Sequence, residues 1–211
     1  AQDAVAFYLL SQRVSESVPV VLSGQGADEV FAGYFWYPLM AAEQGDLLER
    51  FRKYYFDRSH AEFLETVQPD YHAGDCTLKL LRTLLAQDGA ETDMDRILRL
   101  DVTTLLVDDP VKRVDNMTMA WGLEARVPYL DHALVETAFQ MPPELKLKEN
   151  GKYPLKMIAR NLLPDAVIDR PKGYFPVPAM KYIQGDFLDF MRDILLSETC
   201  RQRRLFRPGY I

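Results

Sequence analysis

The chain has 211 residues, of which 48% are hydrophobic and 27% charged, the composition of a folded soluble protein. Its 25 basic and 31 acidic side chains give a net charge of −6, so no surface for nucleic acid is expected. No apolar run is long enough to span a bilayer, and we see no signal peptide. The separated Cys76 and Cys200 fit thiols of a reducing compartment. We therefore expect a cytoplasmic protein without nucleic-acid or membrane partners.

The first expected element is a helix in which Val5, Leu9 and Val14 form an apolar face that must pack on something. It leads directly into Val20–Leu22, a short apolar run typical of a buried parallel strand. Parallel strands need neighbours, yet we find no second convincing strand further along the chain. We therefore expect the C-terminal part of a longer α/β protein whose sheet lies mostly upstream.

A glycine-rich turn over residues 23–26 follows this strand, and residues 27–33 have the composition of a short helix. Such a turn offers backbone N–H groups and the positive end of a helix dipole to an anion. Asp28 and Glu29 lie in the first helical turn, where the simpler interpretation is that they complement the dipole. Because Gly-x-Gly alone is a weak signal, these residues leave a phosphate-binding role open.

The rest of the chain is predicted to be helical, without repeats or a low-complexity linker. Pro110 is assigned to the first turn of one helix, with Asp108 or Asp109 as its cap. Pro142 and Pro143 are expected to stop another helix. The predicted helices cover residues 35–42, 47–55, 61–67, 76–86, 93–106, 110–121, 132–139, 153–163 and 187–196.

Two predicted loops could carry chemistry. In residues 124–131 we favour a buried ion pair between Glu124 and Arg126, with Asp131 as the cap of the next helix. In residues 169–178, DRPKGYFPVP, a lysine stands between prolines that restrict the backbone. Loops on a rigid scaffold often carry catalytic residues, but a single exposed lysine is usually only a solvated charge.

Three segments together resemble the synthetase domain of the glutamine-dependent asparagine synthetases. They are SGQGADEVFAGY at 23–34, DDPVKRVDNMTMAWGLEARVPYLDH at 108–132 and DRPKGYFPVP at 169–178, in the order of the family. The second segment is most similar to a bacterial branch that makes N-acetylglutaminylglutamine amide. The resemblance covers most of the chain.

The fold implied by the resemblance is mainly α with a remnant βα unit. It would be the C-terminal part of an adenine-nucleotide α-hydrolase-like (ATP pyrophosphatase) α/β domain. Residues 1–34 would form the helix–strand–turn edge of the nucleotide-binding layer, and residues 35–211 would form its helical part.

The activity implied by the resemblance has two steps. ATP and Mg²⁺ are used to adenylate a carboxylate with release of pyrophosphate. Ammonia from an N-terminal glutaminase domain then attacks the acyl-adenylate and forms an amide. The carboxylate would be aspartate or a glutamyl dipeptide, and a homodimer is one possible assembly.

The matching motif positions imply roles for five residues. Ser23 and Gly24 would contact the nucleotide, and Asp28 would hold Mg²⁺ on the pyrophosphate. Gln25 stands where some members carry a glutamate; since an amide cannot titrate, it would position the intermediate by hydrogen bonds. Lys172 would meet the departing pyrophosphate or the tetrahedral intermediate, where a fixed cation can lower a barrier by about 3 kcal/mol.

Two family features do not occur in these residues. They are the serine-glycine-glycine nucleotide loop with its aspartate and the N-terminal nucleophilic cysteine of the glutaminase half. We expect both upstream, and we therefore expect a fragment that is inactive by itself. The alternatives are a non-catalytic helical interaction module, against which Asp28 and Lys172 argue, and a β-lactam-forming or peptide-cyclising relative that does not depend on ammonia.

Overall fold

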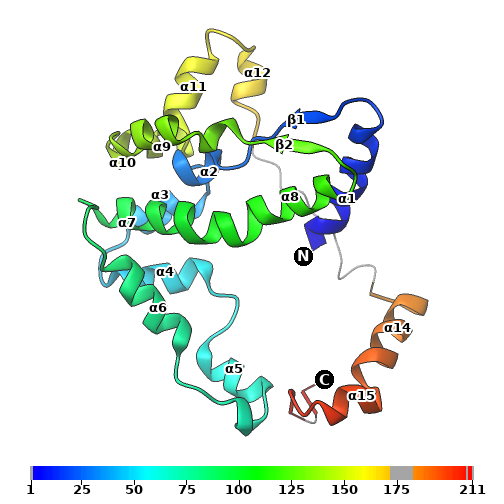
Figure 1. Cartoon of the computed structure of the whole chain (residues 1–211). Helices are drawn as coiled ribbons and strands as arrows, with labels where there is room; N and C mark the ends of the chain where they lie inside the picture. The colour runs from blue at the N-terminus through cyan, green and yellow to red at the C-terminus, as the bar shows by residue number, and fades with distance from the viewer. Residues whose placement is uncertain (1, 172–182, 208, 211) are drawn as a thin grey trace.

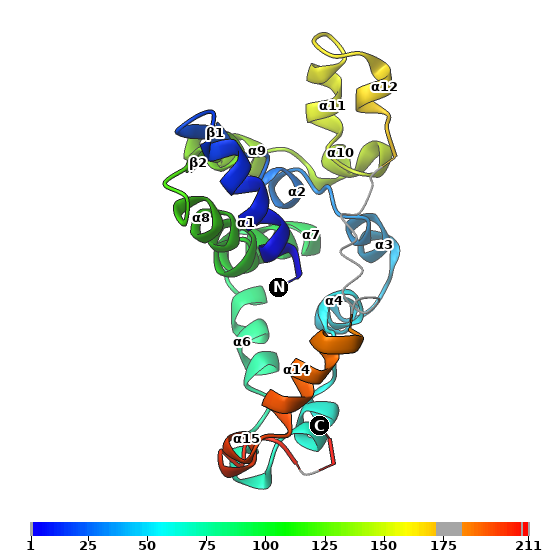
Figure 2. The ribbon, with the colours of Figure 1, turned by 90° about the vertical axis from the view of Figure 1, so that its right-hand side faces the viewer.

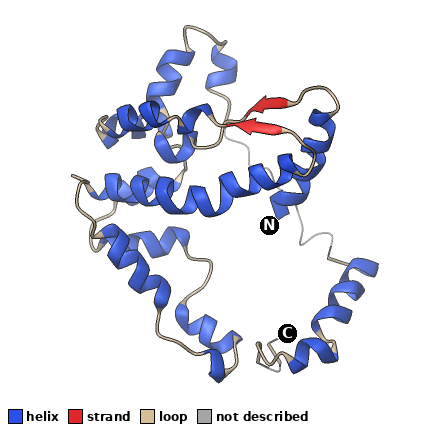
Figure 3. Cartoon of the chain, viewed as in Figure 1, coloured by secondary structure: helices blue, strands red, loops and turns tan. Residues whose placement is uncertain are grey.

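The computed structural model describes residues 2–171, 183–207 and 209–210 (Figure 1). This part of the chain is mainly helical and contains one small parallel sheet (Figure 3). The prediction of a mainly helical chain is therefore confirmed. The elements are α1 (Gln2–Ser15), β1 (Val20–Leu22), α2 (Ala27–Val30), α3 (Trp36–Ala42), α4 (Leu47–Tyr55), α5 (His60–Thr66), α6 (Cys76–Leu85), α7 (Asp93–Leu100), α8 (Lys112–Met119), β2 (Glu124–Arg126), α9 (His132–Phe139), α10 (Pro143–Leu147), α11 (Tyr153–Ala159), α12 (Asp165–Ile168), α14 (Gly185–Leu195) and α15 (Glu198–Gln202).

The sheet consists of β1 and β2, which pair in parallel with Val21 opposite Ala125. The Ser23 N–H extends the pairing by donating to the Arg126 carbonyl at 2.8 Å. The sequence interpretation of 124–131 as a loop missed β2, because Glu-Ala-Arg has neither β-branched residues nor apolar alternation. The strand forms because β1 offers it backbone partners, and the pairing brings the 23–26 turn close to the chain that follows β2.

The expected ion pair between Glu124 and Arg126 is present but is not buried. The Arg126 Nε lies 2.8 Å from Glu124 Oε1, and the two side chains are 62% and 58% exposed. The prediction of a buried pair is therefore wrong, because both side chains project from the solvent-facing side of a three-residue strand. The capping role of Asp131 is confirmed, since its carboxylate accepts the N–H groups of Ala133 and Leu134 at the start of α9.

α7 and α8 are parts of one long helix that runs through the upper body of the molecule (Figure 1). Two π-helical segments, Asp101–Leu105 and Val107–Val111, join them without a break. Pro110 lies inside the second segment, so the prediction that it begins a new helix after an aspartate cap is wrong. Proline lacks an N–H and clashes with the preceding turn of an α-helix, and the wider π turn accommodates it.

The main hydrophobic core lies between α7 and the helices α3, α4 and α6. Ile97 and Leu98 of α7, which lie in the helix predicted over residues 93–106, are completely buried. Tyr37 and Met40 of α3 are completely buried on the opposite side of this core. The core thus fixes α3, which follows directly after α2 and its turn.

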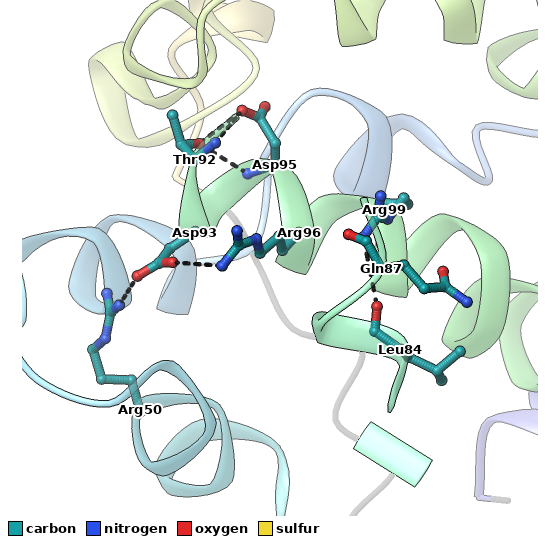
Figure 4. Close-up of polar contacts among 8 residues, drawn as sticks. All are labelled: Arg50, Leu84, Gln87, Thr92, Asp93, Asp95, Arg96 and Arg99. Carbon is teal, nitrogen blue, oxygen red and sulfur yellow. Dashed lines mark hydrogen bonds and ion pairs between the residues drawn. The ribbon is translucent and has the colours of Figure 1, made fainter. Parts of the chain in front are cut away.

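Polar contacts hold both ends of α7 (Figure 4). Its first turn carries a capping box, in which Thr92 and Asp95 exchange hydrogen bonds. Arg50 of α4 bonds the carboxylate of Asp93. Further along, Arg99 donates to the Gln87 carbonyl at 2.8 Å and so closes the connection after α6.

α15 and the residues after it lie near α5, at the end of the molecule away from the sheet, and α14 extends away from α5 (Figures 1 and 2). A bridge between Val67 and Phe206 joins the two regions, and Arg207 donates to the Val67 carbonyl at 3.0 Å. No helix in the part of the chain that the structure describes has the length and apolar character needed to cross a bilayer.

Candidate functional site

The 23–26 turn presents backbone donors at the end of β1. The N–H groups of Gly24, Gln25 and Gly26 bond no other group in the described part of the chain. Gly26 has a left-handed φ of 90°, and a Cβ there would lie 2.3 Å from Leu130 Cδ2, so only glycine fits. Because α2 has only four residues, its dipole is small, and these amides are the main attraction for an anion.

Asp28, in the first turn of α2, faces a lysine that the sequence analysis did not single out. Lys152 Nζ lies 2.9 Å from Asp28 Oδ1, and the two side chains are only 30% and 24% exposed. The lysine stem crosses Gly33, where a Cβ would lie 2.1 Å from Lys152 Cε and 2.3 Å from Asp28 Oδ1. A larger residue than glycine would therefore push the ammonium group off the carboxylate.

The loop that carries this lysine has an unusual backbone. Four consecutive residues, Glu149, Asn150, Gly151 and Lys152, have positive φ angles of 51°, 62°, 98° and 56°. Each non-glycine residue in this region costs about 1 kcal/mol or more, and such residues concentrate at functional sites. The strain is held by docking on the turn after α2, where the Lys152 N–H donates to the Phe31 carbonyl at 2.9 Å.

A cavity of about 810 Å³ lies next to this pair. Gly33 and residues 149–152 line one side of it, and residues 167–171 line the other. The α11–α12 hairpin, which follows the 149–152 loop, separates these two sides in the sequence (Figure 1). Segments that lie far apart in the sequence thus meet around one space beside Asp28.

The walls of the cavity carry charged side chains of both signs. Besides the lysine of the loop, they contain Lys156 and Arg170. The walls also contain two acidic side chains, Glu149 and Asp169, but Arg160 forms ion pairs with both. Lys152 is itself paired with Asp28, and Arg160 is shared among three carboxylates, so the charges of this region balance. Lys156 and Arg170 are the lining cations that an anionic ligand would meet.

Two carboxyl groups are buried near the site, one on α2 and one in the segment that follows α7. Glu29 is 1% exposed and accepts the Tyr34 hydroxyl at 2.6 Å. Asp101 is completely buried, and its Oδ2 accepts the hydroxyl groups of Tyr37 and Tyr55. Burial raises the pKa of Asp101 to about 7, although the two tyrosine bonds oppose the rise. Burial also raises the pKa of Glu29, so both groups favour the protonated form more than exposed carboxyls do.

The predicted site residues fall into two groups. Ser23, Gly24, Gln25 and Asp28 lie together on the turn and the start of α2. Lys172 lies outside the described residues, so its predicted approach to Asp28 stays a prediction. The signal for the missed lysine was weak in sequence, because Asn-Gly predicts only a turn and the partner carboxylate lies more than a hundred residues away.

The chemistry of Asp28 fits Mg²⁺ brought by a nucleotide. No group of three or more His, Cys, Asp or Glu side chains suited to a metal occurs among the described residues. Mg²⁺ usually takes one or two carboxylates and completes its shell with phosphates and water. A single half-buried carboxylate beside a cavity lined by Lys156 and Arg170 agrees with that preference.

The sequence model for asparagine synthase matches residues 1–211. The chain belongs to the asparagine synthase family. Asparagine synthetase [glutamine-hydrolyzing] 1 of Bacillus subtilis (strain 168) is 28% identical over 231 residues, which cover 91% of this chain and 36% of the relative. Asparagine synthetase [glutamine-hydrolyzing] 3 of the same organism is 31% identical over 172 residues, which cover 78% of this chain and 27% of the relative. The asparagine synthetase [glutamine-hydrolyzing] of Homo sapiens is 28% identical over 178 residues, which cover 82% of this chain and 23% of the relative.

Membership of the asparagine synthase family confirms the resemblance drawn from the three motifs. The chain spans only about a third of the length of the first of these relatives, 36%. What the whole relatives do is therefore carried to this chain only as a proposal.

Proposed function

We propose that this chain is the C-terminal portion of an ATP-dependent ligase that adenylates a carboxylate and joins glutamine-derived ammonia to it as an amide. The observation that carries the proposal is the pair of Asp28 and Lys152, which joins the first turn of α2, directly after the 23–26 turn, to the lining of the cavity. Family membership supports the same reaction class. Aspartate or a glutamyl dipeptide is the proposed carboxylate, and a glutaminase domain upstream is the proposed source of ammonia.

The proposed first step needs a site for a polyphosphate. A carboxylate oxygen of the substrate attacks the α-phosphorus of ATP, and pyrophosphate leaves. The N–H groups of Gly24, Gln25 and Gly26 can donate to phosphate oxygens, and Lys152, paired with Asp28, adds a positive charge at the start of α2. Asp28 would hold Mg²⁺, which neutralises phosphate charge when it is bound.

In the proposed second step, ammonia attacks the acyl carbon and AMP leaves. We assign Gln25 a positioning role, since its amide can donate and accept hydrogen bonds but cannot act as a base. We assign Lys172 to the departing pyrophosphate or the tetrahedral intermediate. Ser23 completes the nucleotide contacts at the end of β1.

The test is ATP–pyrophosphate exchange by the full-length protein that contains this chain, with aspartate and with a glutamyl dipeptide as carboxylates. We expect Asp28→Asn and Lys172→Ala each to reduce exchange by about a hundredfold or more, since each removes a charge from the reacting phosphates. Asp88→Asn, which changes an exposed carboxylate on the connection between α6 and α7, is the matched control and should exchange at the wild-type rate.

Two results would overturn the proposal. Absence of both exchange and calorimetric ATP binding in the full-length protein would favour the non-catalytic interaction module. Exchange followed by an intramolecular product without any requirement for glutamine or ammonia would favour a cyclising relative.

A further inference from the structure

Arg160, at the end of α11, binds three carboxylates at once. Its guanidinium group bonds Asp169 through two parallel contacts of 3.1 and 2.9 Å. The same group lies 3.0 Å from Asp165 and 3.4 Å from Glu149. Single exposed ion pairs contribute little, but a forked arginine–carboxylate contact inside a network is geometrically specific.

The partners of Arg160 lie on both sides of the cavity. Glu149 opens the left-handed loop that ends at Lys152, and Asp169 immediately precedes the segment 170–171 on the other side. Both carboxylates belong to residues that line the cavity, whereas Asp165 does not line it. One side chain thus ties the two walls together from the α11–α12 hairpin.

The 149–152 loop needs such a constraint. Three of its four residues are not glycine and hold left-handed backbone angles, which persist only where surrounding contacts determine them. The docking bond from Lys152 to Phe31 fixes one end of the loop, and the ion pair of Arg160 with Glu149 fixes the other.

We infer that Arg160 is a positioning residue of the proposed ligase: through Glu149 and Asp169 it fixes the two cavity walls and keeps the Lys152 ammonium group in place for the nucleotide. The inference rests on the proposed function. It differs from a role in hairpin stability alone, because a stability role would not act through Lys152.

The experiment is a double-mutant cycle in the full-length protein, read as the KM for ATP and the kcat of ATP–pyrophosphate exchange with Mg²⁺. Arg160→Gln should raise the KM for ATP about tenfold in the wild-type background and change kcat less. In the Lys152→Ala background, Arg160→Gln should change the KM for ATP by less than about twofold, because the lysine that Arg160 positions is gone.

Two single-carboxylate variants keep the test valid if Arg160→Gln does not fold. Glu149→Gln removes the link to the loop and leaves the other two partners of Arg160. Asp165→Asn removes a contact within the hairpin that does not reach the cavity. We expect a raised KM for ATP in the first variant and a KM within about twofold of wild type in the second.

The possible outcomes distinguish a failure of the Arg160 inference from a failure of the proposed function. If Glu149→Gln and Asp165→Asn raised the KM for ATP equally, Arg160 would stabilise only the hairpin. The same conclusion would follow if Arg160→Gln raised the KM by the same factor with and without Lys152. A wild-type protein without exchange would instead refute the proposed function.

Discussion

Lys146, on α10, places its ammonium group inside the protein. The residue is completely buried, and its Nζ has no hydrogen-bond partner among the described residues. It lies 4.8 Å from the centre of the Phe139 ring, which offers a partial cation–π contact. Burial lowers the pKa of Lys146 from 10.5 to about 8, while the nearby charge of Asp95 opposes the shift.

This burial predicts a rise in stability with pH. Between the folded pKa of about 8 and the unfolded pKa of 10.5, the unfolded chain binds more protons. The Lys146 contribution to the free energy of unfolding should therefore increase by about 2 kcal/mol from pH 7 to pH 9.5. Lys146→Met should be more stable than wild type at pH 7, with an advantage that shrinks as the pH rises.

Urea denaturation of both proteins across this pH range measures the difference between their free energies of unfolding. Groups other than Lys146 titrate equally in the two proteins, so the difference reports on this lysine. A constant difference between the variant and wild type at all pH values would contradict the depressed pKa.

At the scale of elements, the 149–152 loop packs against the turn after α2. The 149–152 loop approaches the turn after α2 so closely that a Cβ on Gly151 would lie 2.1 Å from the Ala32 carbonyl oxygen. Gly151 also has a φ of 98°, which strains any residue with a side chain. Backbone rather than side chains therefore makes this contact, and backbone cannot easily move aside.

Gly151→Ala should open this contact. We expect the docked loop to lose about 2 kcal/mol, so that hydrogen exchange of the Lys152 amide accelerates about thirtyfold. Gly74→Ala is the matched control, because no heavy atom lies within 4 Å of its Cβ and its φ is not positive. Unchanged protection of the Lys152 amide in Gly151→Ala would contradict the close approach.

At the scale of the whole molecule, large apolar side chains remain exposed on the first helix and the first strand. On α1, Val5 and Leu9 are 64% and 57% exposed, and on β1 Leu22 is 71% exposed. The ion pair of Arg113 with Asp3 anchors α1 on α8 and leaves these apolar side chains exposed. The predicted apolar face of α1 thus exists, but the described residues do not bury it.

This exposure predicts a difference between the isolated chain and the whole protein. A two-stranded parallel sheet is marginal without neighbouring strands, so the 23–26 turn at the end of β1 should be poorly held in residues 1–211 alone. We expect the isolated chain to show no ATP–pyrophosphate exchange under conditions in which the full-length protein is active. Comparable exchange by residues 1–211 would contradict this expectation.

The sequence by itself determined the elements whose signals are local. A capping aspartate before α9 and the apolar residues along the predicted helix 93–106 each specify a helix through neighbours a few residues away. The glycine turn after β1 and the three family motifs are also readable directly. These features predicted most of the helices, the 23–28 part of the candidate site and the family.

Only the tertiary structure decided the features that depend on distant partners. β2 is a strand because β1 lies beside it, and Pro110 stays in a helix because a π turn accommodates it. Lys152 became a site residue because its left-handed loop docks on the turn after α2 and brings its charge to Asp28. Such contacts join residues that are far apart in sequence, so no local pattern of residues carries them.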